Sequence, residues 1–81
     1  MKKEILLSNL DKIHTTELGI ERIRRNTGLD MADIVAWCKV KISNSNSSII
    51  KKGKNWYVEI DNYKITINSY SYTIITVHKI K

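Results

Sequence analysis

Two histidines, His14 and His78, are the side chains of this 81-residue sequence best suited to proton transfer near neutral pH. The sequence has no cluster of carboxylates, no glycine-rich phosphate loop and no spaced set of metal ligands, so it predicts neither a metal site nor a cofactor. Cleavage of RNA needs neither, because the substrate's own 2′-hydroxyl serves as the nucleophile. The protein must then supply a base for that hydroxyl, an acid for the leaving oxygen and cations for the phosphate.

The candidates for these catalytic roles combine the two histidines with a tyrosine and two cations: His78, His14, Tyr72, Arg22 and Lys64. For His78 the catalytic role is favoured. His14 lies between two predicted helices, and capping the C-terminus of the first helix is the favoured role for it. Lys79 follows His78 but points to the opposite face of a regular strand, so only a bulge would bring the two together.

The distribution of charge favours RNA as the partner. The chain holds 14 basic and 8 acidic residues, a net charge of +6. Residues 1–43 contribute eight basic and six acidic side chains, whereas residues 44–81 contribute six and two, so the excess is concentrated in the second half. Such a concentration is typical of a nucleic-acid surface, although solubility alone also explains a moderate positive charge.

The sequence also indicates where the protein resides. Cys38 is the single cysteine, so no internal disulfide forms, and its place in an apolar helical run predicts a buried small hydrophobe rather than a nucleophile. No apolar run approaches the length of a membrane span. We therefore expect a cytoplasmic protein without membrane contact. Its small core leaves a homodimer as an open alternative to the monomer.

Hydrophobic periodicity changes from 3.6 residues to 2 at the polar connector formed by residues 43–48. The helices are predicted over residues 2–13, from Thr15 or Thr16 to a stop at Gly28, and over about 31–42 with Asp30 as N-cap. The strands are predicted at Ile49–Lys52, Trp56–Ile60, Tyr63–Asn68 and Tyr72–Lys79, with turns at Gly53-Lys54, Asp61-Asn62 and 69–71. The prediction is one α+β domain over residues 1–81, in which a helical half (1–42) packs on one face of a four-stranded antiparallel meander (48–81).

Alternation along the strands predicts which face of the sheet is free to bind a partner. The helices are expected to cover Trp56, Val58, Ile60, Tyr63, Ile65, Ile67, Ile75 and Val77. The opposite face is expected to carry Tyr57, Lys64, Thr66, Asn68, Tyr72, Ile74, Thr76 and His78. Tyrosines, a histidine and hydroxyls suit base stacking and phosphate contacts, although a solvated sheet face is often polar as well. The predicted RNA-binding residues are Arg25, Lys51, Lys52, Lys54, Tyr57, Thr66, Asn68, Thr76 and Lys79.

Several segments resemble a family of short uncharacterised proteins from low-GC Gram-positive bacteria, a domain of unknown function. They are residues 12–26, 33–38, 51–57 and 65–79, so the resemblance covers nearly the whole chain. More distantly, helices before a four-stranded meander are similar to RelE-like toxins and their relatives among barnase-, EndoU- and colicin-type endoribonucleases. RelE-like chains usually begin with a strand that is missing here.

The distant resemblance implies an activity and a set of residues. Some of those enzymes place a histidine and arginines in the leading helices, where His14, Arg22 and Arg25 stand. Some place a hydroxyl or basic residue on the last strand; the matching positions are Tyr72, Thr76, His78 and Lys79. The leading hypothesis is a metal-independent endoribonuclease acting on mRNA or ribosome-associated RNA as the toxin of a toxin–antitoxin pair, with a protein antitoxin as partner. The alternatives are a non-catalytic RNA- or ribosome-binding module and a protein-interaction adaptor or inhibitor from a phage or mobile element.

Overall fold

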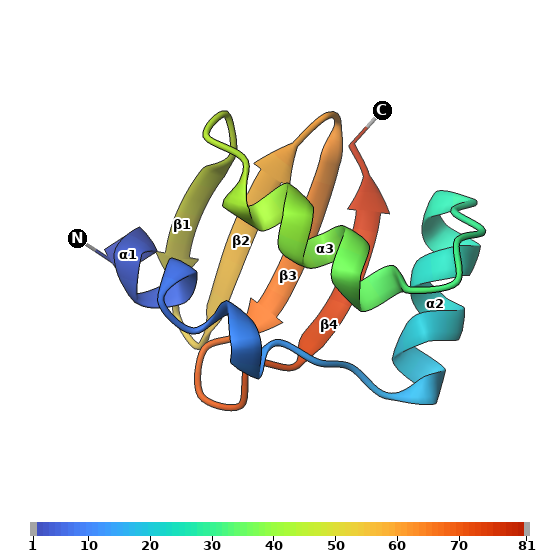
Figure 1. Ribbon diagram of the computed structural model, residues 1–81, viewed down its shortest axis with the longest axis horizontal. Helices are drawn as coiled ribbons and strands as arrows, with labels where there is room; N and C mark the ends of the chain where they lie inside the picture. Colours follow the sequence, from blue (N-terminus) through green and yellow to red (C-terminus); the bar gives the residue numbers. More distant parts are fainter. Residues whose placement is uncertain (1, 81) are drawn as a thin grey trace.

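The helices precede the strands along the chain, and the predicted α+β fold class is confirmed. The computed structural model describes residues 2–80. Its elements are α1 (Lys2–Leu7), a 3₁₀ helix (Leu10–Lys12), α2 (Glu17–Thr27), α3 (Ile34–Ser43), β1 (Ser48–Lys52), β2 (Asn55–Ile60), β3 (Tyr63–Asn68) and β4 (Ile74–Lys79). The strands form one antiparallel sheet in the order β1-β2-β3-β4, and α3 crosses one face of it (Figure 1).

The ends of α2 follow the sequence signals. The side chain of Thr16 accepts a hydrogen bond from the Gly19 amide at 3.0 Å, which caps the first turn. Gly28 ends the helix with a φ of 74°, a left-handed conformation that glycine adopts without steric cost. Both predictions for this helix are therefore confirmed.

The predicted first helix, over residues 2–13, is wrong in its length, because Asn9 interrupts it. The Asn9 side-chain amide donates to the carbonyl of Ile5 at 2.7 Å, the carbonyl that its own backbone N–H would bind in a continuing α-helix. That N–H bonds instead to Leu6 at 3.0 Å. The chain therefore leaves the α-helix after Leu7 and forms a separate 3₁₀ turn.

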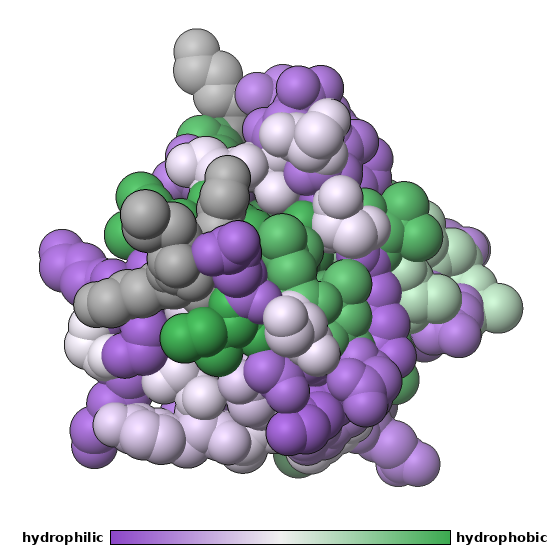
Figure 2. Space-filling view, turned by 60° about the vertical axis from the view of Figure 1, so that its left-hand side comes forward, coloured by the Kyte–Doolittle hydropathy of each residue, from purple (hydrophilic) through white to green (hydrophobic). Residues whose placement is uncertain are grey.

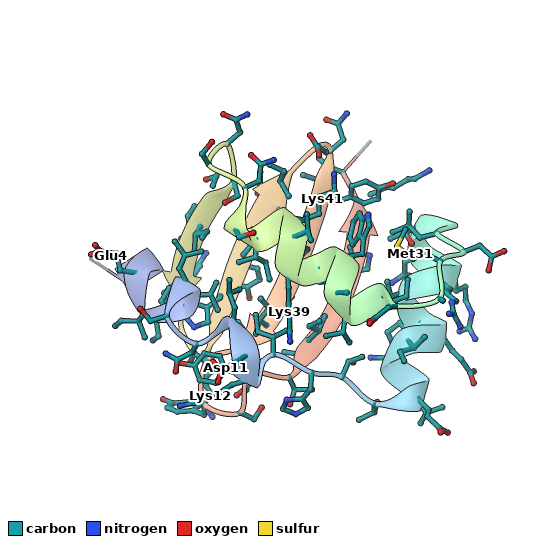
Figure 3. All side chains as sticks on the ribbon, viewed as in Figure 1. Glu4, Asp11, Lys12, Met31, Lys39 and Lys41 are labelled. Carbon is teal, nitrogen blue, oxygen red and sulfur yellow. The ribbon has the colours of Figure 1, made fainter. Side chains whose placement is uncertain are left out.

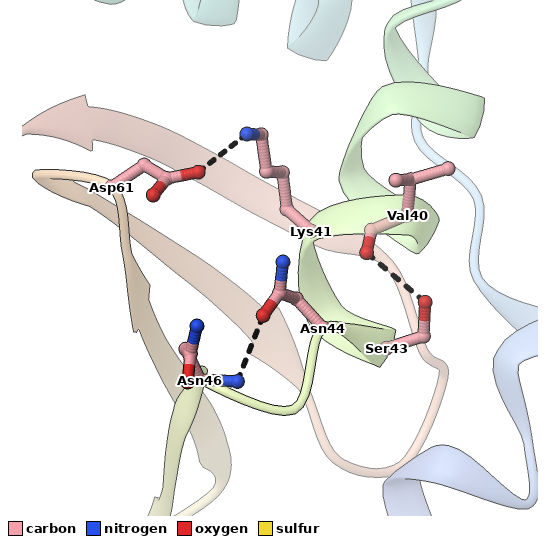
Figure 4. A network of polar contacts seen from close by, with 6 residues as sticks. All are labelled: Val40, Lys41, Ser43, Asn44, Asn46 and Asp61. Carbon is pink, nitrogen blue, oxygen red and sulfur yellow. Dashed lines mark hydrogen bonds and ion pairs between the residues drawn. The ribbon is translucent and has the colours of Figure 1, made fainter.

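The third helix begins later than predicted. Asp33, not Asp30, is the N-cap, and its carboxylate accepts a hydrogen bond from the Ala36 amide at 2.9 Å. At the other end, Lys41 bonds Asp61 in the β2–β3 turn, and Asn44 bonds the amide of Asn46 before β1 (Figure 4). These contacts fix the C-terminal end of α3 over the end of the sheet.

The two tight turns of the meander have the predicted chemistry. Gly53 has a φ of 62°, and Asp61 and Asn62 have φ values of 53° and 67°. Positive φ at these positions matches the right-handed twist of the strands, and glycine, aspartate and asparagine adopt it most readily. The registers on either side of these turns, Lys52↔Asn55 and Ile60↔Tyr63, follow from them.

A bulge in β4 overturns the predicted facing of two isoleucines. Thr66 pairs with Thr76, but Ile67 pairs with Ile74, so Ile75 is an extra residue. Ile74 is consequently 1% exposed in the core, where the prediction placed Ile75.

The outer edge of β4 is covered by the segment that enters α2. The Ile74 amide donates to the His14 carbonyl at 2.7 Å, the His14 amide donates to the Tyr72 carbonyl at 3.2 Å, and the Thr15 hydroxyl donates to the Ile74 carbonyl at 2.9 Å. α2 then lies alongside β4 (Figure 1). The other edge of the sheet is β1.

The core lies between α3, α1 and the facing side of the sheet. Its buried side chains are Leu6, Ile13, Ile23, Ile34, Cys38, Ile42, Trp56, Val58, Ile65, Ile67, Ile74 and Val77. Seen from the side of α1 and β1, apolar side chains also reach the surface between polar ones (Figure 2). Among residues 2–80, no helix has the length and apolarity to cross a membrane.

Candidate nucleic-acid interface

The sheet face turned away from α3, here called the outer face, carries two rows of side chains across the strands. One row is Glu59, Lys64 and His78, which are cross-strand neighbours on β2, β3 and β4. The other row is Ile50, Tyr57, Thr66 and Thr76. Side chains in one row lie about 5 Å apart from strand to strand, and Thr66, which is 8% exposed, is the buried member of the second row.

Lys64 stands between an anion and an aromatic ring. Its ammonium group lies 3.9 Å from a carboxylate oxygen of Glu59 and 5.8 Å from the centroid of the Tyr57 ring. Both charged side chains remain close to half exposed, at 42% for Lys64 and 49% for Glu59. A ligand phosphate can therefore reach this cation without displacing the protein core.

A shallow depression of about 440 Å³ opens on the outer face next to this group. Its lining residues are Ile50, Lys52, Tyr57, Glu59 and Lys64. An aromatic ring and an aliphatic side chain form its apolar part, and two lysines supply cations at its rim. His78 lies one strand further on, next to Lys64 and exposed.

One flank of α2 joins the outer face at β4. The side-chain amide of Asn26 donates to the hydroxyl of Thr76 at 3.0 Å. Arg22 precedes Asn26 by four residues and therefore lies on the same flank, exposed to solvent. Arg25 lies on the side of α2 opposite the buried Ile23 and points away from the sheet.

Tyr72 does not lie on the outer face, where it was predicted. Tyr72 precedes β4 and has a φ of 60°. Its amide donates to the Asn68 carbonyl at 2.9 Å, and its ring packs partly against the core. The ammonium group of Lys12, a residue labelled in Figure 3, lies 5.9 Å from the centroid of this ring. Its role at a site shared with His78 is excluded by this position at the start of β4.

His14 holds the same end of the sheet together. Its Nδ1 donates to the carbonyl of Lys12 at 2.8 Å, at the end of the 3₁₀ helix, and its Nε2 lies 3.1 Å from the Thr73 hydroxyl. His14 therefore has a structural role, but the helix end that it caps is that of the 3₁₀ helix (Leu10–Lys12) and not that of α1, which ends at Leu7. His14 lies beside Thr73 and His78 lies five residues further along, so about 15 Å of strand separates them. The two histidines cannot act on one phosphate.

Other predicted RNA-binding residues divide between the two faces. Thr66, Thr76 and Lys52 lie on the outer face, and Lys54 lies exposed in the adjoining turn. Asn68 also pairs there, but its side-chain oxygen accepts hydrogen bonds from the Tyr70 and Ser71 amides and so shapes the β3–β4 turn. Lys51 and Lys79 alternate with Lys52 and His78 and thus lie on the opposite face, at its ends.

Glu59 is a residue that the sequence reasoning did not select. Glu59 is two residues after Tyr57 on β2 and therefore shares its face, but only the pairing of β2 with β3 sets it beside Lys64. Its signal in the sequence is its place five residues before Lys64, on the other side of the tight turn at Asp61-Asn62, which predicts that the two residues are cross-strand neighbours. Among the described residues, no group of three or more histidines, cysteines, aspartates or glutamates could hold a metal ion.

Comparison with known protein families assigns the chain to one of them. The model of a protein family of unknown function, DUF3781, matches residues 7–78. The chain belongs to this family. The match begins at Leu7, the last residue of α1, and includes α2, α3, β1, β2, β3 and β4 as far as His78. No curated protein and no solved structure matches the chain.

Proposed function

We propose that this chain is a metal-independent endoribonuclease that binds single-stranded RNA on the outer face of its sheet. The observation that carries the proposal is the row of Glu59, Lys64 and His78 beside the partly buried ring of Tyr57. A base, a cation and an acid in one row are the groups that cleavage through the 2′-hydroxyl requires.

The chemistry assigns one role to each member of the row. Glu59 accepts the proton of the 2′-hydroxyl, whose oxygen then attacks the adjacent phosphorus. The bond from phosphorus to the 5′-oxygen breaks, and protonated His78 donates its proton to that oxygen. The products are a 2′,3′-cyclic phosphate and a 5′-hydroxyl. Lys64, between the two, offsets the charge on the phosphate.

The spacing of the row supports these roles. Glu59 and His78 are two strands apart, about 10 Å between Cα atoms, with Lys64 in the middle. Two side chains pointing from these positions can reach the two sides of one phosphate. Tyr57 offers a ring for stacking a base, and Lys52 offers a further phosphate contact at the depression.

Cleavage of a labelled single-stranded RNA in the presence of a chelator tests the proposal. Removing a general acid or base typically lowers the rate by about 10²–10⁴-fold, so His78→Ala and Glu59→Gln should each lose that much. Lys79→Ala is the matched control, because Lys79 adjoins His78 but lies on the opposite face. Replacing the 2′-hydroxyl of the substrate with hydrogen should abolish cleavage by the wild type.

Binding is measured separately on the deoxy-substituted strand. Tyr57→Ala should weaken binding by roughly 5- to 150-fold, since stacking of one base contributes about 1–3 kcal/mol. Tyr70→Ala is the control, because Tyr70 is 75% exposed in the β3–β4 turn, away from Tyr57. Salt-dependent binding without cleavage would refute the endoribonuclease and favour a non-catalytic RNA-binding module. No binding at low salt would leave the protein-interaction adaptor.

The toxin relationship is part of the same proposal. An endoribonuclease toxin acts on cytoplasmic mRNA or ribosome-associated RNA and is held inactive by a protein antitoxin. Expression of the wild type, but not of His78→Ala, should then arrest growth of a low-GC Gram-positive host. If the wild type cleaves RNA in vitro but its expression does not arrest growth, the chain is an endoribonuclease and not a toxin.

A further inference from the structure

The outer edge of β1 pairs with no other strand of residues 2–80, although α1 contacts this strand. β1 pairs with β2 on one side, and no strand among residues 2–80 pairs with its other side. The opposite edge, at β4, is covered by His14 and α2. An edge strand presents unpaired N–H and C=O groups, which can pair with another chain.

The register determines which backbone groups of β1 point outward. Lys52 and Asn55 close a two-residue turn and therefore form a hydrogen-bonded pair. Hydrogen-bonded pairs alternate along an antiparallel ladder, so Ile50 also bonds to Tyr57. The N–H and C=O groups of Ile49 and Lys51 consequently point away from β2, toward the open edge.

This arrangement is self-complementary. If β1 of a second copy runs antiparallel with Ile50 opposite Ile50, each Ile49 faces a Lys51, and these two pairs exchange four hydrogen bonds. Ile50, which is 56% exposed, then meets its equivalent in a pair without backbone hydrogen bonds, where side chains are closest. Each Lys52 faces a Ser48, so no lysine lies opposite a lysine.

Charge supports the same register. On the outer face Ser48 of β1 lies directly opposite Glu59 of β2. Lys52 of the second copy would stand directly beyond Ser48, about 10 Å from Glu59 between Cα atoms. The small serine leaves room for the lysine to reach the carboxylate. The symmetric pair thus makes two such ion pairs, one on each side of the axis.

We propose that two copies of this chain associate through β1, antiparallel and centred on Ile50, to form one continuous eight-stranded sheet. The two outer faces then join, and Lys52 of each copy extends the row of Glu59, Lys64 and His78 in the other. The dimer itself does not depend on RNA cleavage. The role given to Lys52 in that row rests on the proposed function.

Cross-linking tests the register directly. In an antiparallel pair without backbone hydrogen bonds the Cα atoms lie about 4.5 Å apart, within the range that a disulfide spans. The Ile50→Cys variant should therefore form a covalent dimer under mild oxidation. Lys54→Cys, in the neighbouring turn, is the matched control and should stay monomeric. The native Cys38 is fully buried and can be retained.

Sedimentation over a range of protein concentrations tests the association without cross-links. A pair of five-residue strands is a small interface, so we expect a weak dimer that forms at high concentration. Lys51→Pro removes one outward N–H of β1 and none of those bonded to β2, and it should weaken association at least tenfold. Lys51→Ala keeps the N–H and should associate like the wild type. Circular dichroism confirms that both variants fold.

Two outcomes would overturn the dimer: a wild type that stays monomeric at every concentration, or an Ile50→Cys variant that cross-links no faster than Lys54→Cys. Equal association of Lys51→Pro and the wild type would assign any dimer to another surface. All three measurements are made without RNA. A failure of the dimer is therefore separate from a failure of the endoribonuclease.

Discussion

Labelling of Cys38 tests whether α3 packs on the sheet as described. The thiol is 0% exposed, and burial raises its pKa from 9.0 to about 12, because the thiolate loses its hydration. Only the thiolate reacts with disulfide reagents. A difference of about three pH units lowers the thiolate fraction at pH 8 about a thousandfold relative to the unfolded chain.

The same shift makes the free energy of unfolding depend on pH. The folded-state pKa of Cys38 is higher than the unfolded value, so the stabilisation is complete below about pH 9 and is lost as the pH rises toward about 12. Its upper limit is about 4 kcal/mol, from 1.36 kcal/mol for each pH unit. Lysines and tyrosines titrate in the same range. The Cys38→Ala variant, which lacks only this thiol, therefore isolates its contribution by difference.

The assay follows the reaction of the native chain with Ellman's reagent at pH 8 and compares it with the chain unfolded in guanidinium chloride. We expect the native rate to be at least a thousandfold lower, since access as well as ionisation is restricted. Urea titrations between pH 8 and pH 11 should show the wild type losing stability faster than Cys38→Ala. A native rate within tenfold of the unfolded rate would refute the packing of α3 on the sheet, which buries Cys38.

Three further substitutions test local features, each by thermal and urea unfolding. Asn62→Ala should destabilise the fold by about 1 kcal/mol, because Asn62 has a φ of 67°, whereas Asn62→Gly should not. A Cβ atom at Gly19 would lie 2.1 Å from the Thr15 hydroxyl, so Gly19→Ala should cost about 1–3 kcal/mol despite the higher helix propensity of alanine, and a second change, Thr15→Ala, should recover part of the loss. Asn26→Ala removes the bond to Thr76 and should cost about 1 kcal/mol.

Local signals predicted the elements that depend on a few neighbouring residues. Thr16 and Gly28 bound α2 because a cap is a contact between residues three or four apart. The hairpin at Asp61-Asn62 follows from two residues that adopt positive φ. The first helix was predicted too long, because the side chain of Asn9 competes for a backbone carbonyl, and periodicity does not register such competition.

The candidate site was predicted only in part. Alternation correctly placed Tyr57, Lys64 and His78 on one face, since successive side chains in a strand point to opposite sides. It failed from Tyr72 to Ile75, where a bulge inserts one residue and a positive φ turns the chain before β4 begins. Alternation thus predicts from neighbouring residues alone which side chains share a face, but the prediction is valid only where the strand is regular.

The sequence by itself determined the α+β class, the order of the elements, the two tight turns and the residue types available on the outer face, because each depends on short-range periodicity and propensity. The tertiary structure alone decided that His14 bonds Thr73 far from His78, that Glu59 stands beside Lys64, and that β1 rather than β4 is the open edge. These are contacts between segments up to 59 residues apart. They follow from which strands pair and which surfaces the helices bury, and a single sequence does not encode that pairing locally.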